Sequence, residues 1–550
     1  MTRTQWWKWA ALTVTIAACG TTPEDRGDTS GIHELDSPLT ALASCPAGTG
    51  CTFASGALTV ALADTEIAVI SKHPVSGAIL VNDVASYTAA ATPVLATGTN
   101  VKTIAVTMAG TTSHTLILDF ANGTFAPGTA TTPGITVAFG GGASADAFKL
   151  RGQASAADTV TAGVTSGGVH SVAFNADAYA DVSLTGMGTA VTYTFSLGGG
   201  NDVFGADAAS AVAHLGASAT AFPDSVVAYG GLGDDTFKGG LCDDTFYGDL
   251  GNDTFNAGPA KIAPAGSCTG YKTFSGGGGT DTADFSGRGA THGVVFTLDG
   301  VPANGATPAV AGAVADGEDT DDDGIANDGE IDDIQNDVEV VKGGAGNDTF
   351  YSDSSGSPVG HTFQGGPGTD TADYTATTAA IAVTMKDKVA NDGVMGQADN
   401  IMDDVENLKC PTAAVACVVT GNDLDNVFTP GGAGASVFNG GAGNDALDFS
   451  AYASAINIVM DNTVSTTPGF KINTDMENVL CPSGAHNCTV VGNAASNHFY
   501  GGGGVNTLSS MGGDDFIEGV AATDVIDCGD GSDIFTTAVA PTVAALNCEL

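Results

Sequence analysis

The sequence has few basic residues and almost no tryptophan. It holds 16 lysines and arginines against 62 aspartates and glutamates, which leaves a formal net charge of −46 at pH 7. Such a surface is a poor partner for nucleic acid and a good one for cations. The three tryptophans all lie within the first nine residues. The hydrophobic content of 43% is too high for a disordered acidic tail, so the carboxylates must sit on a folded chain.

The sequence also lacks the motifs of common hydrolases. Neither H-E-x-x-H nor G-x-S-x-G occurs, and the nine histidines are scattered. Paired carboxylates are so numerous here that they do not identify a catalytic site. We therefore expect that the chain is not an enzyme.

The first twenty residues, "MTRTQWWKWAALTVTIAACG", have the layout of a secretory signal. Arg3 and Lys8 precede a short apolar run, and small residues precede Cys19. The apolar run is too short to span a bilayer permanently. The sequence predicts a signal peptide over residues 1–18.

The four residues "IAAC" resemble the lipobox of bacterial lipoproteins, which implies that Cys19 is the lipidated first residue of the mature chain. Gly20, rather than aspartate, follows it, and the resemblance then implies delivery to the outer membrane. The alternative is an ordinary signal that is cut near Ala18 and leaves Cys19 free. Residues 19–55 have the polar composition of a flexible tether.

Ten cysteines remain when Cys19 is set aside, and they fall into near neighbours. The pairs are Cys45/Cys51, Cys242/Cys268, Cys410/Cys417, Cys481/Cys488 and Cys528/Cys548. An even set at short separations in a secreted chain predicts disulfides. Thiol chemistry or zinc binding is the less favoured interpretation.

Turn and strand signals fill the rest of the chain. Residues 56–196 alternate short apolar runs with Gly, Thr, Asn and Pro, which is typical of strands and turns. From residue 197 a nine-residue unit dominates, and it occurs three times without a gap in "GGLGDDTFKGGLCDDTFYGDLGNDTFN", residues 230–256. Further units begin at Leu197, Gly276, Gly343, Gly365 and Gly440, and a degenerate run begins at Gly492, Gly501, Ser510, Gly519 and Cys528.

This unit resembles the RTX, or hemolysin-type, calcium-binding repeat, G-G-x-G-x-D-x-U-x, where U is a large apolar residue. The resemblance implies an all-β fold, a parallel β-roll or β-solenoid, with a degenerate β-rich N-terminal portion. Glycines permit the tight turns on which carbonyl oxygens converge, and calcium takes six to eight oxygen ligands. The middle residue of x-U-x then points into a narrow core. The expected calcium residues are Asp202, Gly230, Gly233, Asp235, Asp244, Gly248, Gly251, Asp253, Asp281, Asp348, Asp370, Asp445, Asp515, Asp524 and Asp533.

In the family, two units make one coil, so the resemblance implies that Asp235 and Asp253 flank one ion and that Asp515 and Asp533 flank another. Some units depart from the pattern. Cys242 and Asp249 replace glycines, and asparagine replaces the aspartate at Asn426, Asn497 and Asn506. We expect the asparagine units to keep the coil and to bind calcium weakly or not at all. The alternative at every glycine turn is a plain solenoid corner.

The nine-residue units also form part of a longer repeat, which occurs three times. Its copies begin with "GGGGTDTADFSG" (276–287), "GGPGTDTADYTA" (365–376) and "GGAGNDALDFSA" (440–451), and each leads later into "DVEVV", "DVENL" or "DMENV". The last two copies end in "CPTAAVAC" and "CPSGAHNC", with the same cysteine spacing. The chain therefore divides into repeat blocks at 197–275, 276–491 and 492–550.

The stretch "DTDDDGIANDGE", residues 319–330, fits the loop pattern of an EF-hand. Its ligands would be Asp319, Asp321, Asp323, Ile325 through its carbonyl, Asn327 and Glu330. No flanking helices are evident, and "KVANDGVMGQADN" in the next long copy lacks the preceding aspartates. The match is therefore either a second kind of calcium site or part of the repeat architecture.

These features together predict a calcium-binding, lipid-anchored protein of the outer membrane or cell surface, with a structural, adhesive or binding role. The expected partners are calcium ions and the membrane, through the N-terminal lipid, with no nucleic acid. The sequence does not identify a macromolecular partner. The alternative is a solenoid enzyme, a polysaccharide lyase or hydrolase stabilised by calcium. The scarcity of lysine and arginine counts against a lyase, which needs basic residues to neutralise an acidic sugar.

Overall fold

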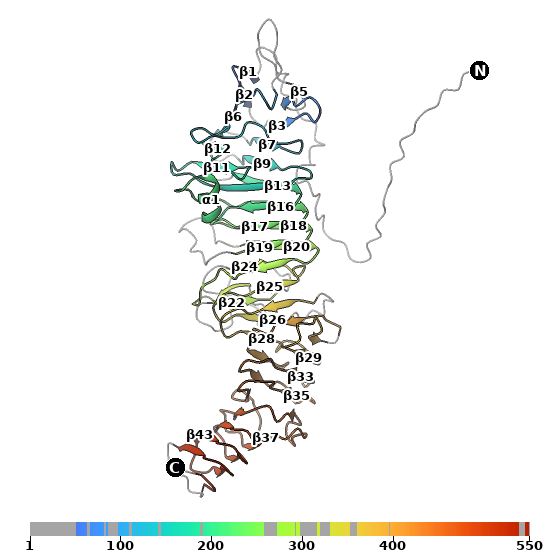
Figure 1. The fold of residues 1–550 in the computed structure, drawn as a ribbon, viewed down its shortest axis with the longest axis vertical. Helices are drawn as coiled ribbons and strands as arrows, with labels where there is room; N and C mark the ends of the chain where they lie inside the picture. Colours follow the sequence, from blue (N-terminus) through green and yellow to red (C-terminus); the bar gives the residue numbers. More distant parts are fainter. Residues whose placement is uncertain are drawn as a thin grey trace, which may run out of the picture.

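The computed structural model describes residues 51–62, 67–81, 84–85, 97–108, 113–140, 145–187, 191–257, 272–291, 293–297, 316–319, 331–352, 360–394, 396–537 and 545–548. These residues form a long stack of short strands with one α-helix (Figure 1). Most neighbouring strands pair in parallel, one coil upon the next. The prediction of an all-β solenoid is therefore confirmed.

The first sheet forms one side of the stack over most of its length. Its strands, in spatial order, are β1 (Cys51–Ala54), β2 (Ala57–Leu62), β6 (Thr103–Met108), β8 (Ile135–Ala138), β12 (Val182–Thr185), β11 (His170–Ala173), β10 (Thr159–Val164), β14 (Val203–Gly205), β17 (Thr236–Lys238), β19 (Thr254–Asn256), β21 (Thr282–Asp284), β25 (Val340–Lys342), β27 (Thr362–Gln364) and β31 (Asn400–Ile401). The short β15 (Thr220–Ala221) pairs with β10.

The second sheet faces it and runs through the stack. Its first ladder is β3 (Ile67–Lys72), β7 (Thr115–Asp119), β9 (Ala147–Arg151), β13 (Thr192–Gly199), β16 (Val226–Leu232), β18 (Asp244–Leu250), β20 (Lys272–Gly278) and β24 (Ile331–Ile334), with β4 (Ile79–Val81) and β5 (Val84–Ala85) added beside β3. Antiparallel β23 (Asp316–Asp319) joins β24 to β22 (Gly293–Phe296). The ladder continues as β26 (Thr349–Tyr351), β28 (Thr371–Asp373), β32 (Asn407–Lys409), β34 (Val427–Thr429), β36 (Ala446–Asp448), β39 (Asn478–Leu480), β41 (His498–Tyr500), β43 (Phe516–Val520) and β45 (Ile534–Thr537).

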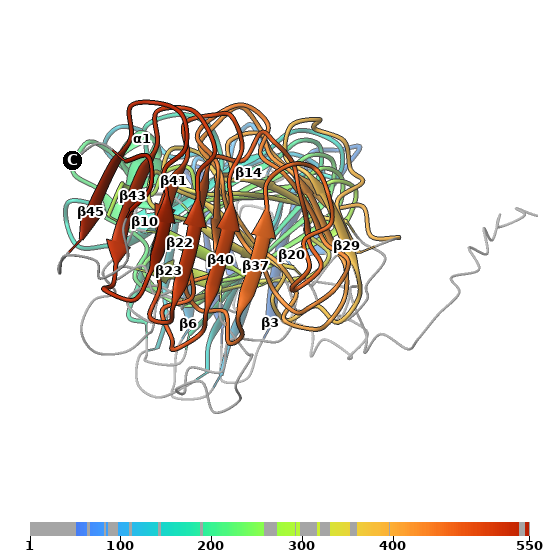
Figure 2. The same cartoon turned by 90° about the horizontal axis from the view of Figure 1, so that it is seen from below.

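Two smaller sheets replace the first sheet in the C-terminal coils. The third sheet holds β30 (Gly393–Val394), β29 (Ile381–Thr384), β33 (Cys417–Thr420), β35 (Val437–Asn439) and β38 (Lys471–Ile472). The fourth holds β37 (Ile456–Val459), β40 (Cys488–Val491), β42 (Asn506–Ser509) and β44 (Val525–Asp527). Figure 2, seen from below, shows the strands of the last coils, such as β37, β40 and β43, in orange to red, with the earlier coils behind them.

The core is a single column of apolar side chains between the sheets. In the three opening units the middle residue of each short strand points inward, and Phe237, Phe246 and Phe255 are at most 1% exposed. Their ring centroids lie 5.3 Å (Phe237 to Phe246) and 5.7 Å (Phe246 to Phe255) apart. Burying one such ring contributes roughly 1.5–3 kcal/mol. Each unit therefore supplies one buried apolar side chain, and it needs neighbouring coils to bury it.

The helix α1 (Ala208–Leu215) is not expected from the repeat pattern. It lies between β14 and β16, where the chain inserts residues into one coil. Asp207 caps it, because its Oδ1 accepts the N–H of Ser210 at 2.6 Å. Ala211 and Leu215 pack against the outside of the first sheet beside Ala173. Among the described residues, no helix has the length and apolar character needed to cross a membrane.

Candidate calcium-binding turns

Each coil has two turns, one at each edge of the stack. Edge one holds the turns that leave the second sheet, such as 230–235 between β16 and β17, and edge two holds the turns that return to it, such as 239–244 between β17 and β18. The expected calcium aspartates on edge one are Asp202, Asp235, Asp253, Asp281 and Asp524. Those on edge two are Asp244, Asp348, Asp370, Asp445, Asp515 and Asp533.

The aspartates of successive coils form a hydrogen-bonded ladder. The backbone N–H of Asp202 donates to Oδ1 of Asp235 at 2.7 Å, and the N–H of Asp235 donates to Oδ1 of Asp253 at 2.7 Å. The N–H of Asp253 continues the ladder to Oδ1 of Asp281 at 2.7 Å. The structure therefore brings Asp235 and Asp253 together, as expected.

Edge two repeats this arrangement in the C-terminal half. The N–H of Asp348 donates to Oδ1 of Asp370 at 2.8 Å, and the N–H of Asp515 donates to Oδ1 of Asp533 at 2.9 Å. The carboxylates thus occupy the same register position in many coils. Oδ1 of each accepts a backbone N–H from the preceding coil.

The second carboxylate oxygen packs directly against the first glycine of the unit. Oδ2 of Asp235 and of Asp253 is buried and has no hydrogen-bond partner among the described residues. A Cβ atom on Gly230 would lie 2.1 Å from Oδ2 of Asp235, and one on Gly248 would lie 2.2 Å from Oδ2 of Asp253. The same orphaned oxygen occurs at Asp202, Asp281, Asp370 and Asp445. The first glycine of the unit therefore leaves room for the carboxylate oxygen itself.

The other glycines of the unit stack carbonyl oxygens along the edge. Gly233 has φ +118° and Gly251 has φ +146°, which L side chains rarely adopt. A Cβ on Gly233 would lie 1.9 Å from the carbonyl oxygen of Gly200, and one on Gly251 would lie 1.9 Å from that of Gly233. Asp249, which replaces a glycine, still has φ 72°. The third copy therefore keeps the turn conformation despite its departure from the pattern.

Burial makes the charged form of these carboxylates costly. Burial raises the pKa of Asp235 to about 8, and the nearby charges of Asp202 and Asp253 add to the rise, while the hydrogen bond from the N–H of Asp202 opposes it. Burial likewise raises the pKa of Asp370 to about 8 and that of Asp445 to about 7. A cation beside the orphaned oxygen would remove this cost.

The residues at the intact turns fit calcium. A hard cation prefers oxygen ligands, and each turn offers a buried carboxylate oxygen and a row of carbonyls. No group of three or more His, Cys, Asp or Glu side chains that could hold a metal occurs in the described part of the chain. At these turns the main chain would therefore have to supply most of the ligands.

A second carboxylate motif caps three of the turns. Asp404 accepts the N–H groups of Gly365 at 3.2 Å and Gly366 at 3.1 Å, and Oε2 of Glu406 accepts the N–H of Asp370 at 2.7 Å. Asp337 with Glu339 binds the turn 276–281 in the same way, and Asp475 with Glu477 binds the turn 440–445. These residues were not among the expected site residues. Their signal in the sequence is the Asp-x-Glu that recurs in each long copy.

At the turns of Asn426 and Asn497, both ends of the asparagine amide hydrogen-bond to protein groups. Oδ1 of Asn426 accepts the N–H of Asn422 at 2.9 Å, and its Nδ2 donates to the carbonyl oxygen of Glu406 at 3.1 Å. The amide thus provides a donor where an aspartate unit has an orphaned oxygen. This arrangement agrees with the expectation of weak or absent calcium binding, which stays a prediction.

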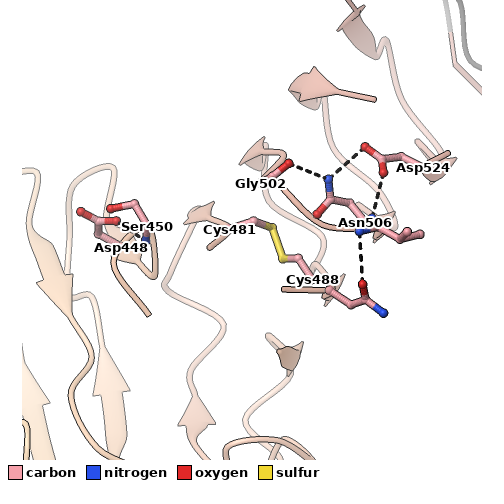
Figure 3. Close-up of a disulfide and its surroundings, with 9 residues drawn as sticks. Asp448, Ser450, Cys481, Cys488, Gly502, Asn506 and Asp524 are labelled. Carbon is pink, nitrogen blue, oxygen red and sulfur yellow. Dashed lines mark hydrogen bonds between the residues drawn. A yellow bond between two sulfur atoms is a disulfide. The ribbon is translucent and has the colours of Figure 1, made fainter. Parts of the chain in front are cut away.

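Asp524 is engaged differently from the ladder aspartates of the intact turns. Its Oδ2 accepts Nδ2 of Asn506 at 2.9 Å and the N–H of Ala521 at 2.7 Å (Figure 3 shows the first contact). Asp244 is also different, because its Oδ2 accepts the N–H of Gly240 at 2.8 Å and lies 3.6 Å from Nζ of Lys272. Asp348 differs in the same way, because its Oδ1 accepts the N–H of Val294 at 2.6 Å and its Oδ2 accepts that of Gly344 at 2.7 Å. These three carboxylates therefore have donors or a cation from the protein itself.

Within the described part of the chain, both cysteines can be followed for three of the five expected disulfides, and all three are present: Cys410–Cys417, Cys481–Cys488 and Cys528–Cys548. The first two close equivalent turns on edge one, and Figure 3 shows the second. Cys242 is also disulfide-bonded. Its expected partner Cys268 lies outside the described residues, as does Cys45, the expected partner of Cys51.

Several other predictions also fall outside the described residues. These are the signal peptide, the tether and Cys19, together with Asp321, Asp323, Ile325, Asn327 and Glu330 of the EF-hand-like stretch. Of that stretch, only the backbone of Asp319, the last residue of β23, is described.

Comparison with known proteins identifies the repeat. The family profile of the RTX calcium-binding nonapeptide repeat (four copies) matches residues 227–255, 336–355, 430–451, 489–517 and 500–535. No curated protein matches the chain. The matched segments include the turns of Asp235, Asp253, Asp348, Asp445, Asp515 and Asp533. The chain is therefore a β-solenoid built with RTX calcium-binding nonapeptide repeats, and its cofactor is Ca²⁺.

Proposed function

We propose that calcium ions bind along both edges of the solenoid at the intact turns and hold its coils together. On edge one the carboxylates would be Asp202, Asp235, Asp253 and Asp281, and on edge two Asp370, Asp445, Asp515 and Asp533. Asp348 is not among them, because its Oδ2 accepts the N–H of Gly344 at 2.7 Å. The observation that carries this proposal is the buried, orphaned Oδ2 above a glycine that has no room for a side chain. Bound calcium supplies the positive charge that the stacked carboxylates lack.

The chain's own residues prepare these turns. The N–H of Asp235 donates to Oδ1 of Asp253, and this hydrogen bond fixes the orientation of the carboxylate. The fold therefore determines the position of Oδ2. The glycines direct carbonyl oxygens to the same edge, because positive φ angles curve the backbone tightly. The Asp-x-Glu caps hold the turns that begin the long copies. Folding and calcium binding are therefore coupled.

We further propose that the solenoid is anchored to the outer membrane through lipidated Cys19 and that it serves as a structural, adhesive or binding element at the cell surface. Three features support this role: the lipobox-like "IAAC", the acidic surface and the long stack of coils (Figure 1). A deletion strain, complemented with the wild-type gene or with a gene in which Asp235 and Asp253 are asparagine, tests it. We expect weaker adhesion or envelope integrity in the deletion strain, and wild-type behaviour in both assays would contradict the role.

A calcium titration tests the metal proposal directly. Chelator-treated protein is titrated with calcium while circular dichroism, the melting temperature and bound metal are recorded, since no tryptophan lies beyond Trp9 to serve as a reporter. A site filled to 100 times its Kd adds about 2.7 kcal/mol to the free energy of unfolding. A titration with potassium at matched ionic strength controls for screening of the net charge of −46. An unchanged spectrum and melting temperature, with no bound calcium, would refute the proposal.

A further inference from the structure

Two basic side chains are buried at turns on edge two, although the chain has only 16 lysines and arginines. The side chains of Lys272 and Asp244 are 1% and 0% exposed, with Nζ 3.6 Å from Oδ2. The side chains of Arg288 and Asp332 are also 1% and 0% exposed, with an N–O distance of 4.0 Å. Most other lysine pairs, such as Lys342 with Asp284, are partly exposed to solvent. A buried charge is costly without a partner, so both pairs need a structural reason.

Lys272 occupies the register position of a ladder aspartate. It pairs with Asp244 on one side and with Asp332 on the other. Its backbone N–H donates to Oδ1 of Asp332 at 3.1 Å, as the N–H of a ladder aspartate would donate to the next one. On edge two, a lysine therefore interrupts the column between two aspartates.

The ammonium group of Lys272 reaches back into the turn 239–244. Nζ donates to the carbonyl oxygen of Cys242 at 2.6 Å and lies beside Oδ2 of Asp244. A carbonyl oxygen and a carboxylate oxygen are the groups that an intact turn offers to calcium. At this turn a protein cation lies between them.

The turn itself is shaped for the lysine. A Cβ on Gly239 would lie 2.4 Å from Cε of Lys272, whereas a Cβ on Gly230 of the preceding unit would lie nearest to Oδ2 of Asp235. Neither Gly239 nor Gly240 has a positive φ, whereas Gly231 and Gly233 do. The turn 239–244 therefore keeps its first glycine to admit a side chain from the next coil and does not adopt the calcium-type conformation.

We propose that Lys272 replaces calcium at the turn 239–244. The ammonium group of its side chain then stabilises edge two of this coil, while a calcium ion stabilises edge one. A second buried cation, Arg288, lies 4.0 Å from Asp332, the aspartate that follows Lys272 in the column. The inference rests on the proposed calcium binding at edge one. It assigns the turn of Asp244 to the calcium-independent part of the fold, although Asp244 fits the repeat pattern. At low calcium these coils keep the packing of edge two and lose that of edge one.

Counting bound calcium tests the replacement. Three full-length proteins are compared by metal analysis at a fixed free calcium concentration: wild type, Asp235→Asn, and the double variant Asp244→Asn with Lys272→Met. The double variant removes both charges, so it leaves no unpaired buried ion. We expect Asp235→Asn to bind at least one calcium fewer per chain and the double variant to bind as many as wild type. A loss of calcium from the double variant would overturn the replacement and leave the proposed function intact. A full count in both variants would instead refute calcium binding at the turn of Asp235.

The single variant Lys272→Met tests the role of the ammonium itself. Without calcium, it should melt at a lower temperature than both wild type and the double variant, because the ammonium group beside the buried carboxylate of Asp244 is then lost. Lys342→Met, at a partly exposed pair, is the matched control and should melt near wild type. Equal melting of Lys272→Met and the double variant would overturn the inference. If Lys272→Met does not fold while the double variant does, the coupling between the two residues is supported.

Discussion

The backbone N–H of Asp235 donates a 2.7 Å hydrogen bond to Oδ1 of Asp253, which lies 18 residues further along the chain. Because each carboxylate gives one oxygen to the coil before it, the other oxygen is held at the edge of the stack. The edge is thereby lined with buried carboxyl groups, one per coil, whose ionisation is costly. The stability of the fold should then depend on whether protons or a cation neutralise these carboxyl groups.

The calcium-free protein should lose stability as the pH rises. The pKa of Asp235 is raised to about 8 and that of Asp253 to about 7 in the folded state, above the ordinary aspartate value. The folded state therefore binds more protons than the unfolded state between about pH 4 and pH 8, and the free energy of unfolding falls over this window. Melting temperatures of metal-free protein at constant ionic strength should decrease from pH 5 to pH 8.

Two comparisons make this result specific. Asp235→Asn should flatten the pH dependence, because it removes one of the titrating groups. Saturating calcium should abolish the fall, because the metal holds the carboxylates ionised. A metal-free melting temperature that rises across the same window would contradict the assignment of the raised pKa values.

Gly248→Ala should disrupt one turn sterically. The new Cβ would lie 2.2 Å from Oδ2 of Asp253 and 2.5 Å from the carbonyl oxygen of Gly276. Overpacking of this kind costs about 1–3 kcal/mol, and it also displaces the oxygen that calcium needs. We expect a lower melting temperature and reduced calcium binding. Gly167→Ala is the control, because only Val169 Cγ2, at 4.0 Å, is near its Cβ. Equal effects of the two variants would count against a special role for Gly248.

Glu406→Ala should destabilise the long copy that begins at residue 365. Oε2 of Glu406 accepts the N–H of Asp370 at 2.7 Å, and the variant leaves that donor without its acceptor. A buried unsatisfied donor costs about 1–3 kcal/mol, which denaturant unfolding in calcium would measure. Asp403→Ala removes a neighbouring exposed carboxylate that pairs with Lys388 at 2.8 Å, and it should have little effect. A null result for Glu406→Ala would show that the cap is dispensable.

Cys19→Ser should release the protein from membranes. If Cys19 carries the lipid, the serine variant keeps the rest of the chain and loses its anchor. Fractionation of cells into membrane and soluble material, followed by immunoblotting, measures the change. Asp28→Ser is a control in the predicted tether and should remain with the membrane. Unchanged membrane association of Cys19→Ser would argue for the ordinary signal peptide.

Short sequence patterns predicted much of the fold and of the candidate site. The nonapeptide predicted strands with one inward side chain, and Phe237, Phe246 and Phe255 are buried as that pattern requires. The equal spacing in "CPTAAVAC" and "CPSGAHNC" predicted two small disulfide loops, which the structure contains. These features were readable because each depends on residues only a few positions apart.

The contacts between stacked coils could not be predicted from short sequence patterns. The ladder hydrogen bonds join residues 18, 28 and 58 positions apart at Asp235, Asp253 and Asp281, because insertions of different length separate the coils. No short motif therefore shows that Glu339 caps the turn of Asp281. The helix α1 was missed for a related reason, since it lies in one of these insertions and shares no residues with the repeat.

The sequence by itself determined that the chain is an acidic all-β solenoid with calcium-binding repeats, because glycine, aspartate and an apolar residue at fixed spacing act within one turn and one strand. Only the tertiary structure decided which edge each turn occupies and which cation its carboxylate meets. Asp235 and Asp244 have the same place in their units, yet Oδ2 of Asp235 accepts no hydrogen bond among the described residues, whereas Oδ2 of Asp244 lies beside Lys272. The difference arises in the next coil, since a buried carboxylate is neutralised by whatever group the stacking brings above it.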